Sequence, residues 1–248
     1  MRLAMFVDGW NMYNSLKRAG IRGYGWCDFK ALARQQTGHT DADVAVKFFT
    51  AEDRPNPEKI DKQQKTWSDA LEFTGCEIIW GEYRRNYFEV DEHIDNDGRW
   101  REKRTDVALA SHMVADCSRN PGYDEAILLT QDSDFIPAVE VVAGKPFNKR
   151  VCVLLPPSEF NSQQNARRIW EPSEGSMVSV RQLSKADFAE ALLPKVVHGP
   201  YGKKATCHPT WMWREKHQSE IAGKRATVAD LQAKFQGEPQ VPKRPAPR

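Results

Sequence analysis

Carboxylate side chains follow an apolar run in the middle of the chain. Residues 126–130 are Ala, Ile, Leu, Leu and Thr, and Asp132 and Asp134 come directly after them. An apolar run followed by a polar turn and Phe135 is typical of a buried strand that leads into a helix, here over residues 134–143. In an open parallel sheet, ligands bind beyond the carboxyl ends of the strands. The two acids therefore stand where they could face a substrate.

Helix capping is the simpler role for one of these acids. Asp is a favoured N-cap residue, and its charge is also favoured near the positive N-terminus of a helix. For this pair alone both roles stay open. Whether further acids reach the same edge of the sheet decides between them.

Two further aspartates could reach this edge. Residues 3–7 form a short apolar run that ends at Asp8, which predicts a second buried strand with an acid at its carboxyl end. Residues 105–119 carry apolar side chains at helical spacing, with Asp106 in the first turn. If the two strands are parallel neighbours, Asp8 and Asp132 project from one edge, and Asp106 can complete the cluster.

Carboxylates gathered in this way favour a metal ion. Three or four of them repel one another, so they must take up protons or hold a cation. Ligation by oxygen alone suits Mg²⁺ or Mn²⁺, which are commonly held by a few carboxylates together with a substrate phosphate. A phosphodiester is then the natural substrate, because such an ion polarises phosphoryl oxygens and activates water.

The elements that must position these acids alternate along the chain. Strands are predicted over residues 3–7, 44–49, 76–80, 126–130 and 150–155, with a short edge strand at 177–180. Helices are predicted over residues 11–19, 28–36, 58–73, 105–119, 134–143, 161–170 and 184–193. This alternation predicts an α/β doubly wound domain whose mostly parallel, five-stranded sheet has helices on both faces.

A polar insertion over residues 81–103 is predicted to form a protruding β-hairpin. Asp-Asn-Asp-Gly at 95–98 is its turn signal, and the flanking segments have strand propensity. The insertion and the next residue concentrate basic side chains, at Arg84, Arg85, Arg99, Arg101, Lys103 and Arg104. A solvated loop is the simpler reading of such a charge run. Tyr87, Phe88 and Trp100 could stack on bases or form the core of the hairpin.

Composition limits the remaining possibilities. The 248 residues carry 36 basic and 34 acidic side chains, so affinity for a polyanion must come from local clustering. No apolar segment is long enough to span a bilayer, and the first residues lack the apolar region of a signal peptide, so a cytoplasmic location without membrane contact is expected. The five cysteines form no C-x-x-C pair, and the spacing around Cys207 and His208 does not favour zinc.

The pattern divides the chain into three parts. Residues 1–183 carry the alternating strands and helices. Residues 184–236 are expected to form a helical and irregular extension that packs on the domain. Residues 237–248, rich in proline and basic side chains, are expected to be disordered.

Three motifs together resemble the NYN family of PIN-like nucleases, and its bacterial LabA-like branch in particular. They are Phe-Val-Asp-Gly-Trp-Asn at 6–11, Lys-Arg-Thr-Asp-Val-Ala-Leu at 103–109 and Leu-Thr-Gln-Asp-Ser-Asp-Phe at 129–135. They occur in the family's order, and the resemblance covers about residues 1–160. It implies a PIN-like fold in which Asp8, Asp106 and Asp132 bind metal, Asp134 supports them or the attacking water, and Asn11 orients Asp8 or contacts phosphate.

The resemblance predicts a metal-dependent endoribonuclease that cuts single-stranded or structured RNA with Mg²⁺ or Mn²⁺. Lys103 and Arg104 are the best candidates for phosphate contacts, with Arg84, Arg85 and Arg101 beside them. Whether the protein forms a homo-oligomer is left open.

One departure from the family keeps an alternative open. Relatives often carry a second acid six residues after the helix Asp, where this chain has His112. Six residues correspond to about 600° of helix, so His112 lies well off the face of Asp106. The alternative is a weakly active or inactive NYN module that binds RNA or acts through protein partners. A phosphotransfer acid pair at Asp132 and Asp134 is a weaker reading, because the motif lacks the expected Thr.

Overall fold

The computed structural model describes residues 1–51, 62–85, 100–158, 160–170 and 175–209 of the chain. Several predictions therefore lie outside the described residues. They concern the hairpin tip with Tyr87 and Phe88, the extension beyond residue 209 and the tail at 237–248. The division at residue 183 stays a prediction.

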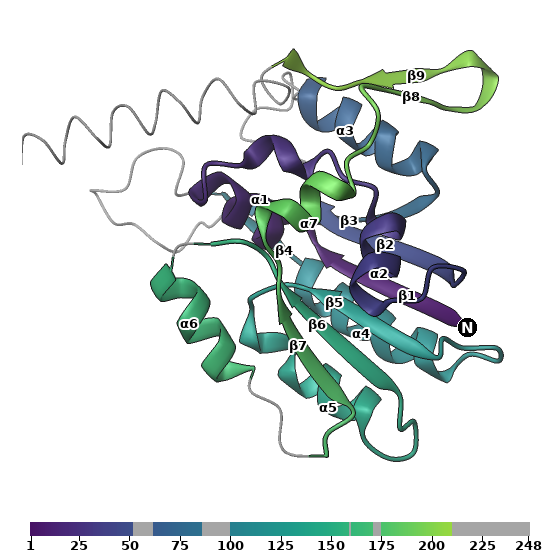
Figure 1. Cartoon of the computed structure of the whole chain (residues 1–248), viewed down its shortest axis with the longest axis vertical. Helices are drawn as coiled ribbons and strands as arrows, with labels where there is room; N and C mark the ends of the chain where they lie inside the picture. Colours follow the sequence, from purple (N-terminus) through teal and green to yellow (C-terminus); the bar gives the residue numbers. More distant parts are fainter. Residues whose placement is uncertain (52–61, 86–99, 159, 171–174, 210–248) are drawn as a thin grey trace, which may run out of the picture. The chain divides into compact units, whose positions relative to one another are not determined.

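The acids are positioned by a sheet whose N-terminal strand lies at its centre (Figure 1). The strand order is β4-β3-β2-β1-β5-β6-β7, and β4 pairs antiparallel with β3 while the other neighbours pair in parallel. The bounds are β1 Arg2–Asp8, β2 Asp43–Ala51, β3 Cys76–Arg85, β4 Trp100–Lys103, β5 Glu125–Leu129, β6 Arg150–Leu155 and β7 Val178–Gln182.

The predicted count of five strands is too low, because β7 is the sixth member of the parallel set. The predicted hairpin is confirmed only in part. β3 continues past Trp80, and Glu82 to Arg85 pair with Trp100 to Lys103. The base of the hairpin is therefore a continuation of the main sheet.

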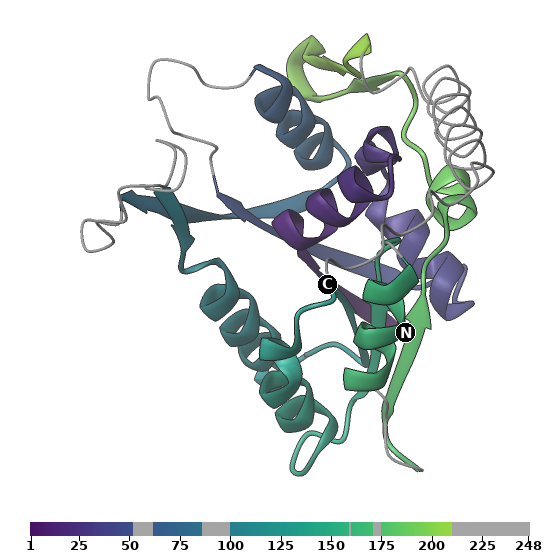
Figure 2. The same cartoon turned by 90° about the vertical axis from the view of Figure 1, so that its left-hand side faces the viewer.

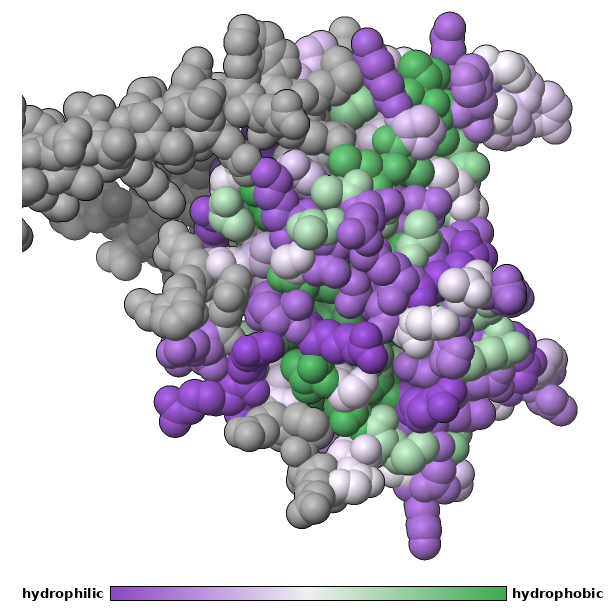
Figure 3. Space-filling model, in the orientation of Figure 1, coloured by the Kyte–Doolittle hydropathy of each residue, from purple (hydrophilic) through white to green (hydrophobic). Residues whose placement is uncertain are grey.

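Helices cover both faces of the sheet, as predicted (Figures 1 and 2). One face is packed by α1 Gly9–Arg18, α2 Phe29–Thr37, α3 Lys62–Phe73 and α7 Lys185–Glu190, and the other by α4 Thr105–Ser118, α5 Ile136–Ala143 and α6 Phe160–Ile169. The strands alternate accordingly, so that Met5 joins the first core and Phe6 the second. The outer surface drawn in Figure 3 is mostly hydrophilic, with apolar side chains in small groups.

Sequence signals account for several helix ends. The Asp28 side chain accepts hydrogen bonds from the backbone N–H groups of Lys30 and Ala31 at the start of α2. Ser184 and Asp187 form the predicted capping box of α7. This helix ends at Glu190, three residues earlier than predicted for it. No helix among the described residues is long and apolar enough to cross a membrane.

After Pro194 the chain forms a second, two-stranded sheet where no periodicity was found in the sequence. β8 Val196–His198 and β9 Lys204–Thr206 pair antiparallel and pack on α3. The turn between them contains a short 3-10 helix, η4 Pro200–Gly202.

Candidate functional site

Asp8 ends the central strand and begins α1. Its Oδ1 accepts a hydrogen bond from the backbone N–H of Asn11 at 3.1 Å, and its Oδ2 accepts one from the Thr130 hydroxyl at 2.9 Å. The residue is only 7% exposed. Burial raises the pKa of Asp8 from its ordinary 3.8 to about 6; the two hydrogen bonds oppose this, whereas Asp106 and Asp132 add to it.

Gly9 explains how a helix can start directly at this acid. A Cβ atom at Gly9 would lie 2.5 Å from the Phe48 ring and 2.6 Å from the carbonyl oxygen of Phe49. Both of these residues belong to β2, which runs beside β1. Only glycine allows the backbone to turn so close to the neighbouring strand, and the turn keeps Asp8 at the edge of the sheet.

Thr130 joins the ends of the two central strands. Its hydroxyl donates to Asp8 and accepts a hydrogen bond from the backbone N–H of Asp132 at 3.0 Å. Nearby, the Asn11 side-chain oxygen accepts a hydrogen bond from the backbone N–H of Gln131 at 2.9 Å. Asn11 therefore contacts the β5 loop, while its own backbone N–H holds Asp8.

Asp132 has the capping role that the sequence left open. Its Oδ1 accepts a hydrogen bond from the backbone N–H of Asp134 at 3.0 Å, at the start of the 3-10 helix η3 Ser133–Phe135. The helix predicted over residues 134–143 is therefore this short turn followed by α5. The half-buried Asp132 caps the turn and also helps to raise the pKa of Asp8. Helix capping therefore does not exclude a role for Asp132 among the acids.

Asp106 lies in the first turn of α4, as predicted. Its side chain is exposed, and its pKa is raised first by lost hydration and then by repulsion from Asp132 and Asp134. The four predicted acids thus act electrostatically on one another across three segments of the chain. Within the described residues, no lysine, arginine or histidine forms an ion pair with any of them.

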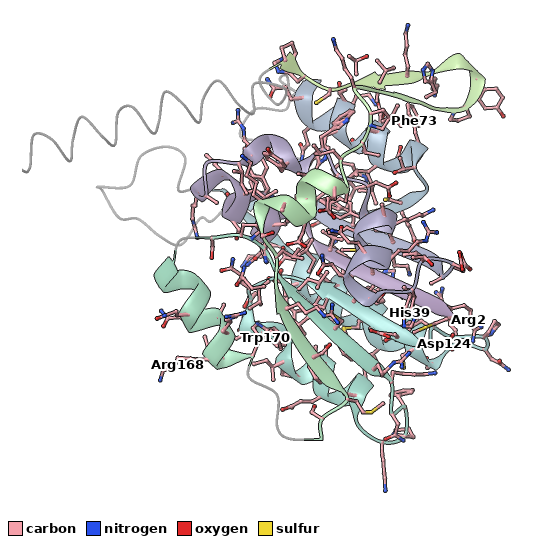
Figure 4. All side chains as sticks on the ribbon, in the orientation of Figure 1. Arg2, His39, Phe73, Asp124, Arg168 and Trp170 are labelled. Atoms are coloured by element: carbon pink, nitrogen blue, oxygen red, sulfur yellow. The ribbon has the colours of Figure 1, made fainter. Side chains whose placement is uncertain are left out.

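The opposite edge of the sheet shows the contrast. There Asp124 accepts a hydrogen bond from the backbone N–H of Arg2 at 2.7 Å and pairs with its guanidinium at 3.4 Å. Glu125 pairs with Arg150 at 3.1 Å and approaches His39 at 4.0 Å. Figure 4 shows Arg2, Asp124 and His39 gathered at this edge. Asp124 and Glu125 at the amino edge are thus paired with basic side chains, whereas the four predicted acids form no such pair among the described residues.

The described residues contain no group of three or more His, Cys, Asp or Glu side chains that is already arranged to hold a metal ion. The donor chemistry of the four acids nevertheless fits a hard cation, because all of their ligand atoms are carboxylate oxygens.

The predicted phosphate contacts are only partly described. Lys103 and Arg104 are exposed directly before α4, and Arg104 pairs with Glu82 of β3. Arg104 also adopts a left-handed backbone conformation, with φ of 76°. Arg84, Arg85 and Arg101 lie in the paired part of β3 and β4, but their side chains, like that of Trp100, fall outside the described ones.

His112 does not face the acids. Its Nδ1 lies 2.9 Å from the ammonium of Lys47, and its ring packs edge-on against Phe49 with a centroid distance of 5.6 Å. Lys47 is a buried lysine on β2 that also pairs with Asp116 of α4 at 2.7 Å. Because an ammonium group only donates, His112 Nδ1 is the acceptor in this contact. His112 therefore helps to hold α4 against β2.

Sequence reasoning missed two contributors to the site. Thr130 and Gln131 stand inside a quoted motif, yet neither was given a role. Gln131 binds the carbonyl oxygen of Pro156 at 2.9 Å through its side chain, which ties the β5 loop to the end of β6. The motif places the polar Thr130 at the end of an apolar run and just before Asp132, which could have suggested a role for it. Its hydrogen bonds to Asp8 and Asp132 depend on the fold and could not be predicted.

The mostly parallel sheet with helices on both faces makes the described part of the chain an α/β protein. The NYN domain family model matches residues 2–169, from β1 to the end of α6. The chain therefore belongs to the NYN family, a family of PIN-like nucleases that typically use divalent metals.

The chain was also compared with solved structures and with curated proteins. The crystal structure of a protein of unknown function from Vibrio parahaemolyticus RIMD 2210633 is similar, with 19% identity and a TM-score of 0.46 over 75% of this chain and 94% of that one. No curated protein matches the chain.

Proposed function

We propose that the protein is a metal-dependent endoribonuclease whose site is formed by Asp8, Asp106 and Asp132. The observation that carries this proposal is the convergence of acids from three separate NYN motifs at one sheet edge, where burial raises the pKa values of Asp8 and Asp106 and repulsion between the acids adds to the rise. Family membership supports a nuclease. RNA as the substrate and Mg²⁺ or Mn²⁺ as the ion are the proposed details.

The three acids would hold the ion after rotation of their side chains. Asp106 has the most freedom to move, because it is exposed on a first helical turn. Asp8 has the least, because two hydrogen bonds and burial fix it. When bound, such an ion polarises phosphoryl oxygens and lowers the pKa of water.

The remaining residues serve the acids and the substrate. Asn11 holds Asp8 through its backbone N–H and stays close to the β5 loop through its side chain. Asp134 is exposed beside Asp132, so it can accept a proton from water or a hydrogen bond from RNA. Lys103 and Arg104 precede Asp106 and supply positive charge for phosphates.

Cleavage of a mixed RNA pool tests the proposal directly. Wild type, Asp132→Asn and Asp69→Asn are each incubated with Mg²⁺, Mn²⁺ or a chelator, and the new RNA ends are sequenced. Asp69→Asn is the matched control, because it removes a carboxylate from the outer surface of α3. We expect cleavage by wild type and Asp69→Asn only with metal, and none by Asp132→Asn.

Two results would contradict this proposal in different ways. Cleavage that persists in Asp132→Asn would remove the assigned site. Absence of any metal-dependent cleavage by wild type would instead favour the NYN module that binds without cutting.

Phosphate contacts are tested by binding without metal. Alanine at both Lys103 and Arg104 should weaken RNA binding and reduce the slope of log K against log salt by about 1.4, at roughly 0.7 per lost contact with a single strand. An unchanged slope would remove these residues from the substrate path.

A further inference from the structure

The sharpest unassigned surface feature is the hairpin formed by residues 195–206, which we call the Tyr201 hairpin. Tyr201 at its turn is 98% exposed, more than any other large apolar or aromatic residue described. A tyrosine ring has flat faces that suit stacking and a polar hydroxyl that tolerates water. The ring is therefore available as a contact surface.

The turn that carries Tyr201 is held by hydrogen bonds. The backbone N–H of Gly199 donates to the carbonyl oxygen of Lys203 at 2.8 Å, and that of Lys203 donates to Pro200 at 3.1 Å. Tyr201 has φ of 56°, a left-handed conformation that glycine adopts far more easily than tyrosine. The turn therefore carries an exposed aromatic ring in a backbone conformation that disfavours it.

The base of the hairpin is fixed to the domain. Val197, Ala205 and Cys207 are buried in the same core as α1 and α3. Gly199 lies directly on Phe73, since a Cβ atom at Gly199 would come within 2.5 Å of that ring. Figure 4 shows Phe73 beneath the hairpin. The hairpin that carries Tyr201 is thus packed on the core and is not a loose loop.

Charge on the hairpin has one sign. Lys195, Lys203 and Lys204 are all exposed, and His198 pairs opposite Lys204 in the small sheet. Residues 194–210 contain no acidic residue, although the chain as a whole is nearly balanced. An exposed aromatic ring among lysines matches the combination that binds single-stranded nucleic acid, in which bases stack and phosphates pair with cations.

The hairpin lies away from the acidic site. Phe73 is the last residue of α3, and β3 begins shortly after it, so the hairpin sits near the amino edge of the sheet (Figure 1). The 12 residues of α3 span about 18 Å, and this length of helix separates the hairpin from the acidic edge. Only an RNA that extends across this side of the domain can touch both.

We propose that the Tyr201 hairpin is a second binding surface for single-stranded RNA, which rests on the proposed ribonuclease function. Tyr201 stacks on a base, while Lys203 and Lys204 contact the neighbouring phosphates. The surface selects long RNA over short RNA, because a short oligonucleotide at the acidic edge does not reach it.

Binding in chelator tests the proposal, with Asp132→Asn as the parent so that RNA stays intact. Tyr201→Gly removes the ring and suits the left-handed turn, so folding is preserved and a thermal melt verifies this. We expect Tyr201→Gly to weaken binding of long single-stranded RNA about 5- to 150-fold, the range of one stacked base. Binding of a short oligonucleotide should not change, and Tyr201→Phe should bind like the parent.

Polyphosphate and a polyglutamate peptide serve as probes without bases. Tyr201→Gly should leave polyphosphate binding unchanged, whereas alanine at Lys203 and Lys204 should weaken both polyphosphate and RNA. Equal binding of long RNA by the parent and Tyr201→Gly would overturn the proposal. If alanine at Lys203 and Lys204 weakened the binding of polyglutamate but not that of RNA, the proposal would also be overturned, since the partner would then be an acidic protein.

Failure here is separable from failure of the nuclease proposal. Binding is measured without metal in a variant that does not cut, so it does not depend on cleavage. Conversely, a wild-type protein that cuts RNA while Tyr201→Gly binds long RNA normally would refute only the hairpin surface.

Discussion

The hydroxyl of Thr130 donates to Oδ2 of Asp8 at 2.9 Å, although 122 residues separate them in sequence. The same hydroxyl accepts from the backbone N–H of Asp132. One completely buried oxygen atom therefore sets the position of both the most buried acid and the loop that carries the next one.

Thr130→Val should reduce both stability and metal-dependent activity. Valine keeps the shape but leaves the N–H of Asp132 unsatisfied and removes a donor from Asp8, which should cost about 1–3 kcal/mol of unfolding free energy. Urea denaturation measures the stability, and a Mn²⁺ titration of RNA cleavage measures the effect on the site. Thr130→Ser, which retains the hydroxyl, should recover most of both. Equal losses in the serine and valine variants would show that packing and not hydrogen bonding matters.

Asp8→Asn should stabilise the metal-free protein at neutral pH while abolishing activity. The pKa of Asp8 is about 6 in the folded protein and ordinarily 3.8, so the folded state binds more protons between these values. The contribution of Asp8 to stability therefore falls as pH rises from 3.8 to 6 and stays low above it. The difference corresponds to roughly 3 kcal/mol at neutral pH. Thermal melts from pH 4 to 8 in chelator should show the gain growing with pH.

Asp124→Asn provides a control of opposite sign. The backbone N–H of Arg2 lowers the pKa of Asp124, so its stabilising effect is present at neutral pH and is lost as pH falls. Asparagine there should lower the melting temperature at pH 7 and have little effect under acidic conditions. Parallel pH trends for the two variants would refute the assigned electrostatics of Asp8.

Restoring an acid at the family position should not increase activity much. In His112→Glu the new carboxylate meets the Lys47 ammonium, as His112 Nδ1 does now at 2.9 Å, and not the acidic edge. We expect cleavage within about threefold of wild type, less than 0.7 kcal/mol in the barrier. Steady-state kinetics at limiting Mn²⁺ checks this. An increase of tenfold or more would mean that the missing acid is a direct ligand.

Removing Lys47 should destabilise the docking of α4. Lys47→Met leaves the half-buried Asp116 with only the exposed Arg119 as an ion-pair partner among the described residues, which should cost up to about 3 kcal/mol, and Asp116→Leu in the same chain should restore much of it. Lys65→Met is the surface control. Its pair with Asp69 at 3.1 Å lies on an exposed helix face, so its loss should cost less than about 1 kcal/mol. A similar cost for both lysines in urea denaturation would contradict the burial argument.

Local patterns predicted most of the parallel sheet, because five of its strands contain short apolar runs. The edge strand predicted at 177–180 corresponds to β7 but was not counted in the predicted sheet; β7 alternates half-buried and exposed side chains and carries Arg181 and Gln182. Residues 196–206 escaped prediction for a related reason. The strands β8 and β9 have three residues each, and Tyr201 adopts a left-handed backbone conformation that is normally expected of glycine.

The candidate acids could be proposed from motif and position, but their surroundings could not. The spacing of His112 from Asp106 indicated that it lies off the acid face, and the structure agrees. Its partner Lys47 lies 65 residues away, so no helical period could reveal the pair. The same holds for Thr130 and Asp8, whose contact depends on β1 pairing with β5.

The central place of β1 also has a consequence for how the protein is made. Asp132, which follows β5, is synthesised 124 residues after Asp8. At about 5–20 residues per second, this takes roughly 6–25 s. During that interval the nascent chain can pair β1 with β2 and β2 with β3, yet Asp8 has no partner on its other side. If the protein cuts RNA as proposed, its site stays incomplete until the part of the message that encodes Asp132 has been translated.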